Sequence, residues 1–185
     1  MSGITGIYIT GNELKIEKET LVKMRDVLIH RGPDDEGLYI SKDKKTGLGF
    51  RRLATIDLSK KANQPIANQD KTIQLVFDGV IYNFQEIKEE LIKKGYKFKS
   101  KADSEVLLCL YEEKGRDCLN DLNGMFSFVI WDEKKKEIFA ARDRLGIKPF
   151  YYYYQEGVFL FGSEIKAILA NPLVKKEPNL EGISH

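Results

Sequence analysis

The order of strand-like and helical segments along the chain predicts an α+β fold. Strand-like segments dominate the first part of the sequence and return in the last third, and two helical segments lie between them. Most strand-like segments are separated by charged or glycine-containing turns, which favours antiparallel neighbours. Single strands and helices do not alternate, so the sequence does not predict a parallel sheet of βαβ units. We expect largely antiparallel sheets.

The first half of the chain contains mostly strand patterns. We expect a strand over residues 4–9 before a turn at 10–12, a helix over about 18–30, strands over 38–41 and 46–53, and a strand over 73–77 that continues into 78–83. Two segments rich in Gly, Pro and polar residues, Arg31–Gly37 and Asn63–Asp70, predict loops. Gly79 lies inside an apolar stretch, which indicates a bulge or a close approach of backbone to a ligand.

The second half begins with two helices and ends with strands. Asn83 followed by Glu86 predicts a helix start, and Gly95 ends that helix. Asp103 is expected to cap a second helix that ends at Gly115. The later expected elements are strands over 125–131, 137–141, 150–154 and 158–161 and a short helix over 164–169 capped by Ser163. Residues 1–170 are expected to form one domain, and residues 171–185 the start of a linker.

Composition restricts the classes of partner. The 185 residues carry a net charge of +2, which gives no general reason to expect nucleic acid binding. The lysine-rich run 93–101 alternates Lys with Tyr96 and Phe98 and predicts a strand with one solvent-facing side. Cys109 and Cys118 lack metal-ligand spacing and suit a reducing compartment, and Cys109 is expected in the core. No membrane-spanning run or signal peptide is apparent. We expect a cytoplasmic protein without a metal or other cofactor.

The first residues contain a candidate nucleophile. Ser2 follows Met1 directly, and its small side chain favours removal of Met1. Ser2 would then carry a free α-amine beside its hydroxyl, which places a nucleophile and its base on one residue. Many chains begin with Met-Ser for no catalytic reason, so this observation alone leaves an ordinary N-terminus as the simpler interpretation.

Several segments taken together resemble a known family. They are Ser2–Ile7, Arg31–Gly37, Arg52–Ser59, Gln64–Ile66, Asp78–Asn83, Asn123–Phe126 and Ala141–Pro149. In this order they are similar to the class II glutamine amidotransferase domain of asparagine synthetases, over nearly the whole chain. The resemblance implies a four-layer α-β-β-α sandwich of two antiparallel sheets, of the N-terminal-nucleophile hydrolase type.

The resemblance also implies an activity and its partners. Such a domain hydrolyses L-glutamine to glutamate and ammonia, and a C-terminal ATP-dependent synthetase domain uses the ammonia in asparagine biosynthesis. In this family a cysteine occupies the position of Ser2. A homodimer is compatible with the resemblance, whereas nucleic acid and membrane partners are not expected.

The family pattern assigns roles to individual residues of this sequence. Ser2 takes the nucleophile position, and Gly79 offers a backbone N–H to the oxyanion. Arg52 would pair with the substrate α-carboxylate, which suits a bidentate guanidinium. Asp103 would hold the α-ammonium group. The remaining residues expected along the site are Leu53, Ala54, Thr55 and Ile56.

Three departures from the family pattern lie at this site. Ser2 replaces the cysteine, and a hydroxyl is much harder to deprotonate than a thiol. Asp78 replaces an asparagine whose N–H completes the oxyanion hole, and an ionised Asp can only accept and would repel negative charge. Loss of one such donor typically costs on the order of 10²–10³ in rate. Val80 replaces a glutamate that helps to bind the α-amino group. We therefore expect weakened or lost glutaminase activity.

Two alternatives to catalysis stay open at the level of sequence. The domain could be a non-catalytic module that docks onto a synthetase domain, as in the heads of β-lactam synthetases and lasso-peptide cyclases. It could also sense an amino acid without turning it over. Arg52 and Asp103 fit both a working substrate clamp and an unused remnant of one.

Overall fold

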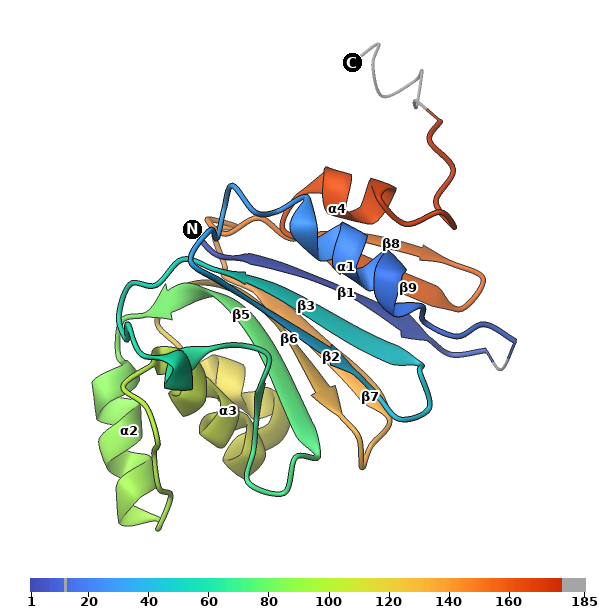
Figure 1. The fold of residues 1–185 in the computed structure, drawn as a ribbon. Helices are drawn as coiled ribbons and strands as arrows, with labels where there is room; N and C mark the ends of the chain where they lie inside the picture. Colours follow the sequence, from blue (N-terminus) through green and yellow to red (C-terminus); the bar gives the residue numbers. More distant parts are fainter. Residues whose placement is uncertain (12, 178–185) are drawn as a thin grey trace.

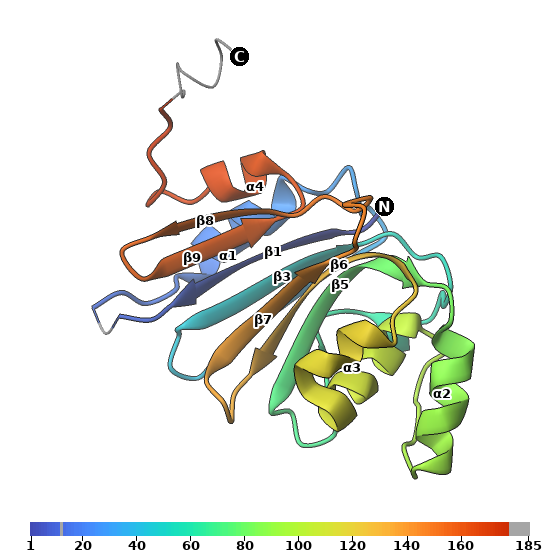
Figure 2. The same ribbon diagram turned by 180° about the vertical axis from the view of Figure 1, so that it is seen from behind.

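The computed structural model describes residues 1–11 and 13–177, which form two stacked antiparallel sheets between two helical layers (Figure 1). Helices α1 and α4 cover the outer face of one sheet, and α2 and α3 lie on the outer side of the other. Figure 2 shows the same four layers from behind. The α+β class and the expected α-β-β-α layering are both confirmed.

The elements of the described residues have the following bounds. The strands are β1 (Gly3–Ile9), β2 (Asp35–Ile40), β3 (Thr46–Arg52), β4 (Ile66–Ala67), β5 (Ile73–Ile81), β6 (Gly124–Asp132), β7 (Glu137–Arg142), β8 (Tyr151–Gln155) and β9 (Val158–Gly162). The helices are α1 (Lys18–Asp26), α2 (Phe84–Lys93), α3 (Asp103–Lys114) and α4 (Ile165–Leu169), with 3-10 turns η1 (Lys60–Ala62) and η2 (Gly115–Asn120).

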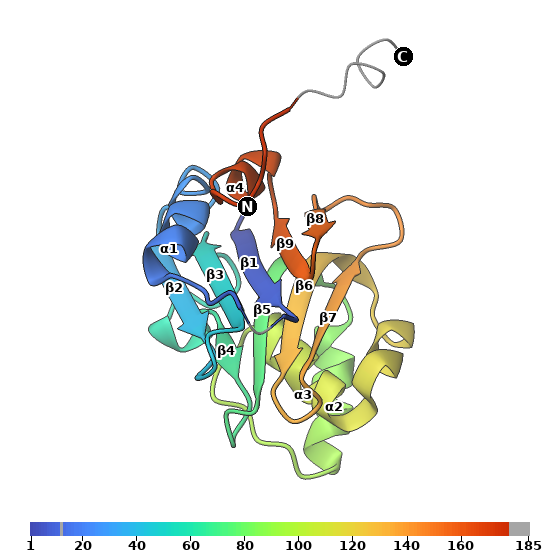
Figure 3. The same cartoon turned by 90° about the vertical axis from the view of Figure 1, so that its right-hand side faces the viewer.

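Both sheets are wholly antiparallel. The first has the order β2-β3-β1-β9-β8, and the second has the order β4-β5-β6-β7. Strand β1 lies in the centre of its sheet, paired with β3 on one side and β9 on the other, as Figure 3 shows from the side. This central position fixes the residue just before β1, because Gly3 is in register with Arg51 of β3.

The alternation of side chains along each strand separates the core into layers. In β1, Ile4 packs between the two sheets, whereas Ile7 packs toward the helices α1 and α4. In β5, Val76 lies between the sheets, whereas Leu75 and Phe77 join the core under α3. The same period carries Asp78 to the space between the sheets, and that space is where the start of the chain lies.

The lysine-rich run was predicted as a strand, and this prediction is wrong. Residues 96–100 form an irregular segment between α2 and α3. Tyr96 and Phe98 both pack against the core under α3, on one side as in a strand, but the segment pairs with no strand among the described residues. The alternation of Lys with aromatic residues here results from a connection whose aromatic side chains anchor it to the domain.

The two capping residues predicted for helices were also wrong. Ala102 precedes α3, and Asp103 is its first residue, with a carboxylate that accepts the N–H of Ile81 in β5 at 3.0 Å. Glu164 precedes α4, and the hydroxyl of Ser163 accepts the N–H of Ile4 at 3.0 Å. Each polar side chain binds the backbone of a strand, and Asp103 in addition accepts the N–H of Ser104 in the first turn of α3 at 2.9 Å.

Other boundaries differ in ways that affect the site. The predicted loop over 31–37 ends earlier, because Asp35–Gly37 already pairs with β3. The predicted loop over 63–70 contains the short strand β4. The predicted helix over 18–30 ends at residue 26, and a turn follows. Val174 is buried against the core under α1, so the packed part of the chain extends past residue 170; residues 178–185 of the expected linker, and Asn12 of the expected first turn, lie outside the described residues.

Candidate active site

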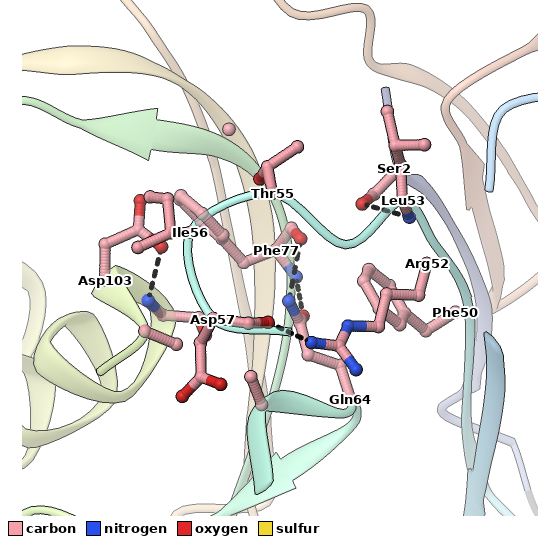
Figure 4. Close-up of a pocket in the computed structure, with 14 residues that line it drawn as sticks. Ser2, Phe50, Arg52, Leu53, Thr55, Ile56, Asp57, Gln64, Phe77 and Asp103 are labelled. Carbon is pink, nitrogen blue, oxygen red and sulfur yellow. Dashed lines mark hydrogen bonds between the residues drawn. The ribbon is translucent and has the colours of Figure 1, made fainter. Parts of the chain in front are cut away.

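A small cavity of about 50 Å³ opens beside the start of the chain, between the ends of β3 and β5 and the first turn of α3 (Figure 4). Residues from distant parts of the sequence line it: Ser2, Phe50, Arg52, Leu53, Thr55, Ile56, Asp57, Ala62, Gln64, Phe77, Gly79, Ala102, Asp103 and Ser104. The cavity lies at one end of the sandwich, beside the ends of β3 and β5.

Ser2 is held beside the cavity by hydrogen bonds to its backbone and to its hydroxyl. Its main-chain oxygen accepts a hydrogen bond from Nε of Arg31 at 2.9 Å. Its Oγ accepts the N–H of Leu53 at 3.2 Å, so the loop after β3 contacts the hydroxyl directly (Figure 4). The end of a central strand thus presents the hydroxyl to the cavity with a defined orientation.

Arg52 reaches the cavity from β3, and its neighbour does not. Arg51 points to the opposite face of the sheet, where it pairs with Asp26 of α1 at 2.7 Å. The Arg52 guanidinium donates to Oδ1 of Asn63 at 2.7 Å and to the main-chain oxygen of Asp57. Because a guanidinium has five N–H donors, these two bonds leave donors for a carboxylate ligand.

The loop after β3 closes over the cavity. Through Oδ2, Asp57 accepts the N–H of Lys101 at 2.9 Å and so ties the loop to the start of α3. Hydrogen bonds from the Lys101 N–H and from Ser59 lower the pKa of Asp57 to about 2. The cavity of about 50 Å³ is open to solvent, and the loop after β3 forms one of its walls.

The exposed edge of β5 supplies a backbone donor to the cavity. The N–H of Phe77 bonds Oε1 of Gln64 at 2.6 Å, and the N–H of Ile81 bonds Oδ2 of Asp103 at 3.0 Å. Both groups point away from β6, and the two-residue period of the strand directs the N–H of Gly79 the same way. That N–H lies between Gln64 and Asp103 and faces the cavity, as an oxyanion donor must.

Glycine is needed at position 79 because the neighbouring strand β6 lies close, whereas the sequence indicated a bulge or a close approach to a ligand. The pairing of β5 with β6 runs without interruption, so there is no bulge. A Cβ at Gly79 would lie 2.4 Å from the main-chain oxygen of Met125, so glycine allows the two strands to approach. Gly79 also lines the cavity, so a side chain here would affect both the sheet and the site.

Asp103 is a buried carboxylate whose partners among the described residues are backbone N–H groups. Oδ2 accepts from Ile81 at 3.0 Å, and Oδ1 accepts from Ser104 at 2.9 Å. Burial raises the pKa of Asp103 above its ordinary value, although these backbone N–H groups act in the opposite direction. A buried carboxylate without a cationic partner is suited to receive a ligand ammonium group.

Asp78 lies in the layer between the sheets, behind Ser2 and outside the cavity lining. Its Oδ2 accepts from Nη2 of Arg31 at 2.9 Å, and its Oδ1 lies 3.6 Å from Nζ of Lys148. The side chain is 2% exposed, so both contacts are shielded from water. The charge from which we expect repulsion of a developing anion thus has two cations beside it, and the carboxylate provides no N–H donor.

The three charged groups also affect the chain terminus. Burial lowers the pKa of the Met1 α-amine below its ordinary value, and the Asp78 carboxylate raises it. Arg31 and Lys148 lower that pKa in the same direction as burial. These charges therefore act on the terminus of the chain as it stands with Met1 in place.

The structure brings most of the predicted site residues together. Ser2, Arg52, Leu53, Thr55, Ile56, Gly79 and Asp103 line one cavity. Ala54 and Val80 do not line it, and the N–H of Ala54 bonds the carboxylate of Asp34 at 2.8 Å. Sequence reasoning did not single out Gln64 as a site residue, although its position before Pro65 in a motif was a signal. It also missed Arg31 and Lys148 as partners of the site.

Searches for two other features were negative within the described part of the chain. No group of three or more His, Cys, Asp or Glu side chains across residues 1–11 and 13–177 is arranged to hold a metal ion. Over the same residues, no helix combines the length and apolar character needed to cross a membrane.

Comparison with known proteins identifies the family. The sequence profile of the family described as "Glutamine amidotransferase domain" matches residues 1–185. Asparagine synthetase [glutamine-hydrolyzing] 3 of Bacillus subtilis is 43% identical over an alignment 186 residues long, which covers 100% of this chain and 30% of that protein. Asparagine synthetase B [glutamine-hydrolyzing] of Escherichia coli is 39% identical and covers 91% of this chain and 30% of its own length.

A solved structure supports the fold independently. The glutamine phosphoribosylpyrophosphate amidotransferase of Bacillus subtilis, in complex with ADP and GMP, superposes with a TM-score of 0.76 at 21% identity. The match covers 91% of this chain and 43% of that one, and it confirms the N-terminal-nucleophile amidotransferase fold. The chain spans 30% of the length of the two curated relatives. The chain thus belongs to the glutamine amidotransferase domain family, as found in asparagine synthetases.

Proposed function

We propose that this domain binds L-glutamine in the cavity beside Ser2 and hydrolyses it far more slowly than a site with a complete set of oxyanion donors. The observation that carries the binding half is the meeting of Arg52 and Asp103 in one cavity with the terminal hydroxyl. A guanidinium and a buried carboxylate match the α-carboxylate and α-ammonium groups of an amino acid. The amide carbon of the side chain would then approach Ser2.

The chemistry requires Met1 to be removed. The free α-amine of Ser2 takes the hydroxyl proton while Oγ attacks the glutamine side-chain amide. The resulting tetrahedral oxyanion accepts a hydrogen bond from the N–H of Gly79. When this intermediate collapses, the protonated α-amine gives its proton to the leaving nitrogen, and ammonia is released. Water then hydrolyses the ester on Ser2 and releases glutamate. The same amine serves as base in this second step.

We expect slow hydrolysis of glutamine for two physical reasons. A serine hydroxyl needs a stronger base than a thiol does, and a terminal amine is a weak base. Asp78 donates no N–H to the developing anion, because an ionised carboxylate has only acceptor oxygens; Oδ2 accepts from Arg31, and Oδ1 lies 3.6 Å from the ammonium of Lys148. Loss of one oxyanion donor costs on the order of 10²–10³ in rate.

The wider role follows from the relatives, which are named as glutamine-hydrolysing asparagine synthetases. We propose that this domain works with an ATP-dependent synthetase domain, in the same chain or another, and that the ammonia it releases is used there. If the site binds glutamine without turnover, the domain acts instead as a sensing or docking module. The missing donor at Asp78 is the specific observation that favours this second candidate.

Calorimetric titration with L-glutamine tests the binding half. We expect saturable binding by the wild-type chain and loss of that binding in Arg52→Gln and in Asp103→Asn. Lys114→Met is a matched control, because Lys114 pairs with Asp121 at 2.9 Å on the surface away from the cavity. Equal binding by all four proteins, or none by the wild type, would contradict the proposed clamp.

A further inference from the structure

Three buried charges stand in a row behind Ser2. The side chains of Arg31, Asp78 and Lys148 are 8%, 2% and 7% exposed. Arg31 holds Ser2 by donating Nε to its main-chain oxygen at 2.9 Å, and it donates Nη2 to Oδ2 of Asp78 at 2.9 Å. Lys148 takes the other carboxylate oxygen, Oδ1, at 3.6 Å. Each oxygen of Asp78 therefore has its own cation.

The presence of a separate cation at each oxygen is important because Arg31 could bind Asp78 in another way. A guanidinium and a carboxylate prefer two parallel hydrogen bonds when both oxygens are available. A bidentate pair would turn the Arg31 guanidinium toward Asp78 and withdraw Nε from the oxygen of Ser2. Lys148 lies 3.6 Å from Oδ1, and its positive charge near that oxygen disfavours a turn of the Arg31 guanidinium toward it.

Lys148 is fixed in place by its own main chain. Its N–H donates to Oδ2 of Asp143 at 3.0 Å, and its carbonyl oxygen accepts from Arg142. Its ammonium therefore enters the layer between the sheets from a rigid turn after β7. Glu164, which lies 3.5 Å from Nη1 of Arg31, adds a second carboxylate to the cluster. Glu164 also pairs with His30 at 2.8 Å and with Lys166 at 3.1 Å, so Arg31 is the member of the cluster that contacts both carboxylates.

We propose that Lys148 is a positioning residue for Ser2. By neutralising one oxygen of Asp78 it keeps Arg31 on the main-chain oxygen of Ser2, and so orients the hydroxyl and the amine. The proposal rests on the proposed function in one respect, that Ser2 is the reacting residue. A misplacement of about 1 Å in such a group can cost on the order of a hundredfold in rate.

The sequence allows the Ser2 carbonyl to be observed alone. Ser2–Gly3 is the only Ser-Gly pair in the chain. Labelling with carbonyl-¹³C serine and ¹⁵N glycine therefore gives one carbonyl-to-amide correlation in an NMR spectrum, that of Ser2. A carbonyl carbon moves upfield when its oxygen loses a hydrogen bond. This resonance reports the Arg31 contact in the folded wild-type protein and needs no glutamine.

The test compares charge variants at positions 78 and 148. Lys148→Met is expected to move the Ser2 resonance upfield, whereas Lys148→Arg leaves it near the wild-type position. Adding Asp78→Asn to Lys148→Met is expected to return the resonance toward wild type, because an amide has one acceptor oxygen and no charge for Arg31 to follow. The surface variant Lys114→Met is the control and should change nothing.

A second measurement separates positioning from packing. In a Ser2→Cys background, iodoacetamide should alkylate the terminal thiol more slowly when Lys148→Met is added, by about tenfold or more. The rate should recover in the triple variant with Asp78→Asn. A Ser2 resonance unmoved by Lys148→Met, or a rate that Asp78→Asn does not restore, would overturn the proposal.

If Lys148→Met does not fold, the double variant with Asp78→Asn still tests the proposal. Lys148→Met leaves a buried carboxylate short of one cation and is expected to lower Tm, whereas Asp78→Asn/Lys148→Met removes both charges and is expected to fold. If the double variant also fails to fold, Lys148 acts by packing, and the proposal is wrong. Failure to bind glutamine would contradict the proposed function and leave this test unaffected.

Discussion

Asp103 is the residue through which pH acts on this site. Its carboxylate is buried against the backbone of β5, and burial raises its pKa above the ordinary value of 3.8. A ligand ammonium group needs the ionised form. The residue therefore loses its ability to bind that group at a higher pH than an exposed aspartate would.

The prediction at this scale is a pH profile of glutamine binding. Affinity should be constant near neutral pH and should fall as the pH drops through the raised pKa of Asp103, above 3.8. The sign for folding is opposite, because a carboxyl with a raised pKa in the folded state stabilises the fold at low pH and loses that contribution as pH rises. Calorimetry across this range checks the binding profile, and an affinity independent of pH down to 4 would contradict it.

Residue types at the site were predictable from sequence, but their partners were not. Ser2 could be singled out by its position directly after Met1, and Arg52 and Asp103 through the resemblance to the amidotransferase family. The role of Arg31 depends on a chain turn that brings it to Ser2 and Asp78 at once. The cations beside Asp78 could not be predicted, since a sequence pattern does not reveal which charged side chains share its layer.

Strand β5 is the element that joins the sheet to the site. Its N–H groups alternate, so those of Phe77, Gly79 and Ile81 share one edge, and Gln64 and Asp103 take the outer two. The alternation predicted from sequence was sufficient to place these groups on one edge. The irregular segment over residues 96–100 could not be predicted, because its aromatic side chains respond to a core formed by distant residues.

The prediction for this element concerns Gly79→Ala. The new Cβ would meet the main-chain oxygen of Met125 at 2.4 Å, so the paired strands must separate. We expect a loss of about 1–3 kcal/mol in the free energy of unfolding, measured by urea denaturation.

Gly11→Ala is the matched control for that substitution. An added Cβ there meets nothing within 4 Å, and we expect a change within about 0.5 kcal/mol. Equal stability of the two variants would show that the approach of β5 to β6 does not require glycine.

The whole molecule is a sandwich of two sheets, and the N-terminus lies at one end of the layer between them. The order of strands and helices predicted the α+β class, and the resemblance supplied the four layers, which the topology confirms. The pairing of β1 between β3 and β9 joins segments far apart in sequence, so local patterns could not give it. That pairing is what holds Ser2 against the cavity.

Glutamate release from L-glutamine tests the central claim most directly. The wild-type chain, with removal of Met1 verified by intact mass, should release glutamate at a rate near zero. A variant combining Ser2→Cys, Asp78→Asn, Val80→Glu and Lys148→Met should gain appreciable activity, because it restores a thiol and an N–H donor without leaving an unpaired buried lysine. Turnover by the wild-type chain at an enzyme-like rate of about 1 s⁻¹ or more would contradict the account.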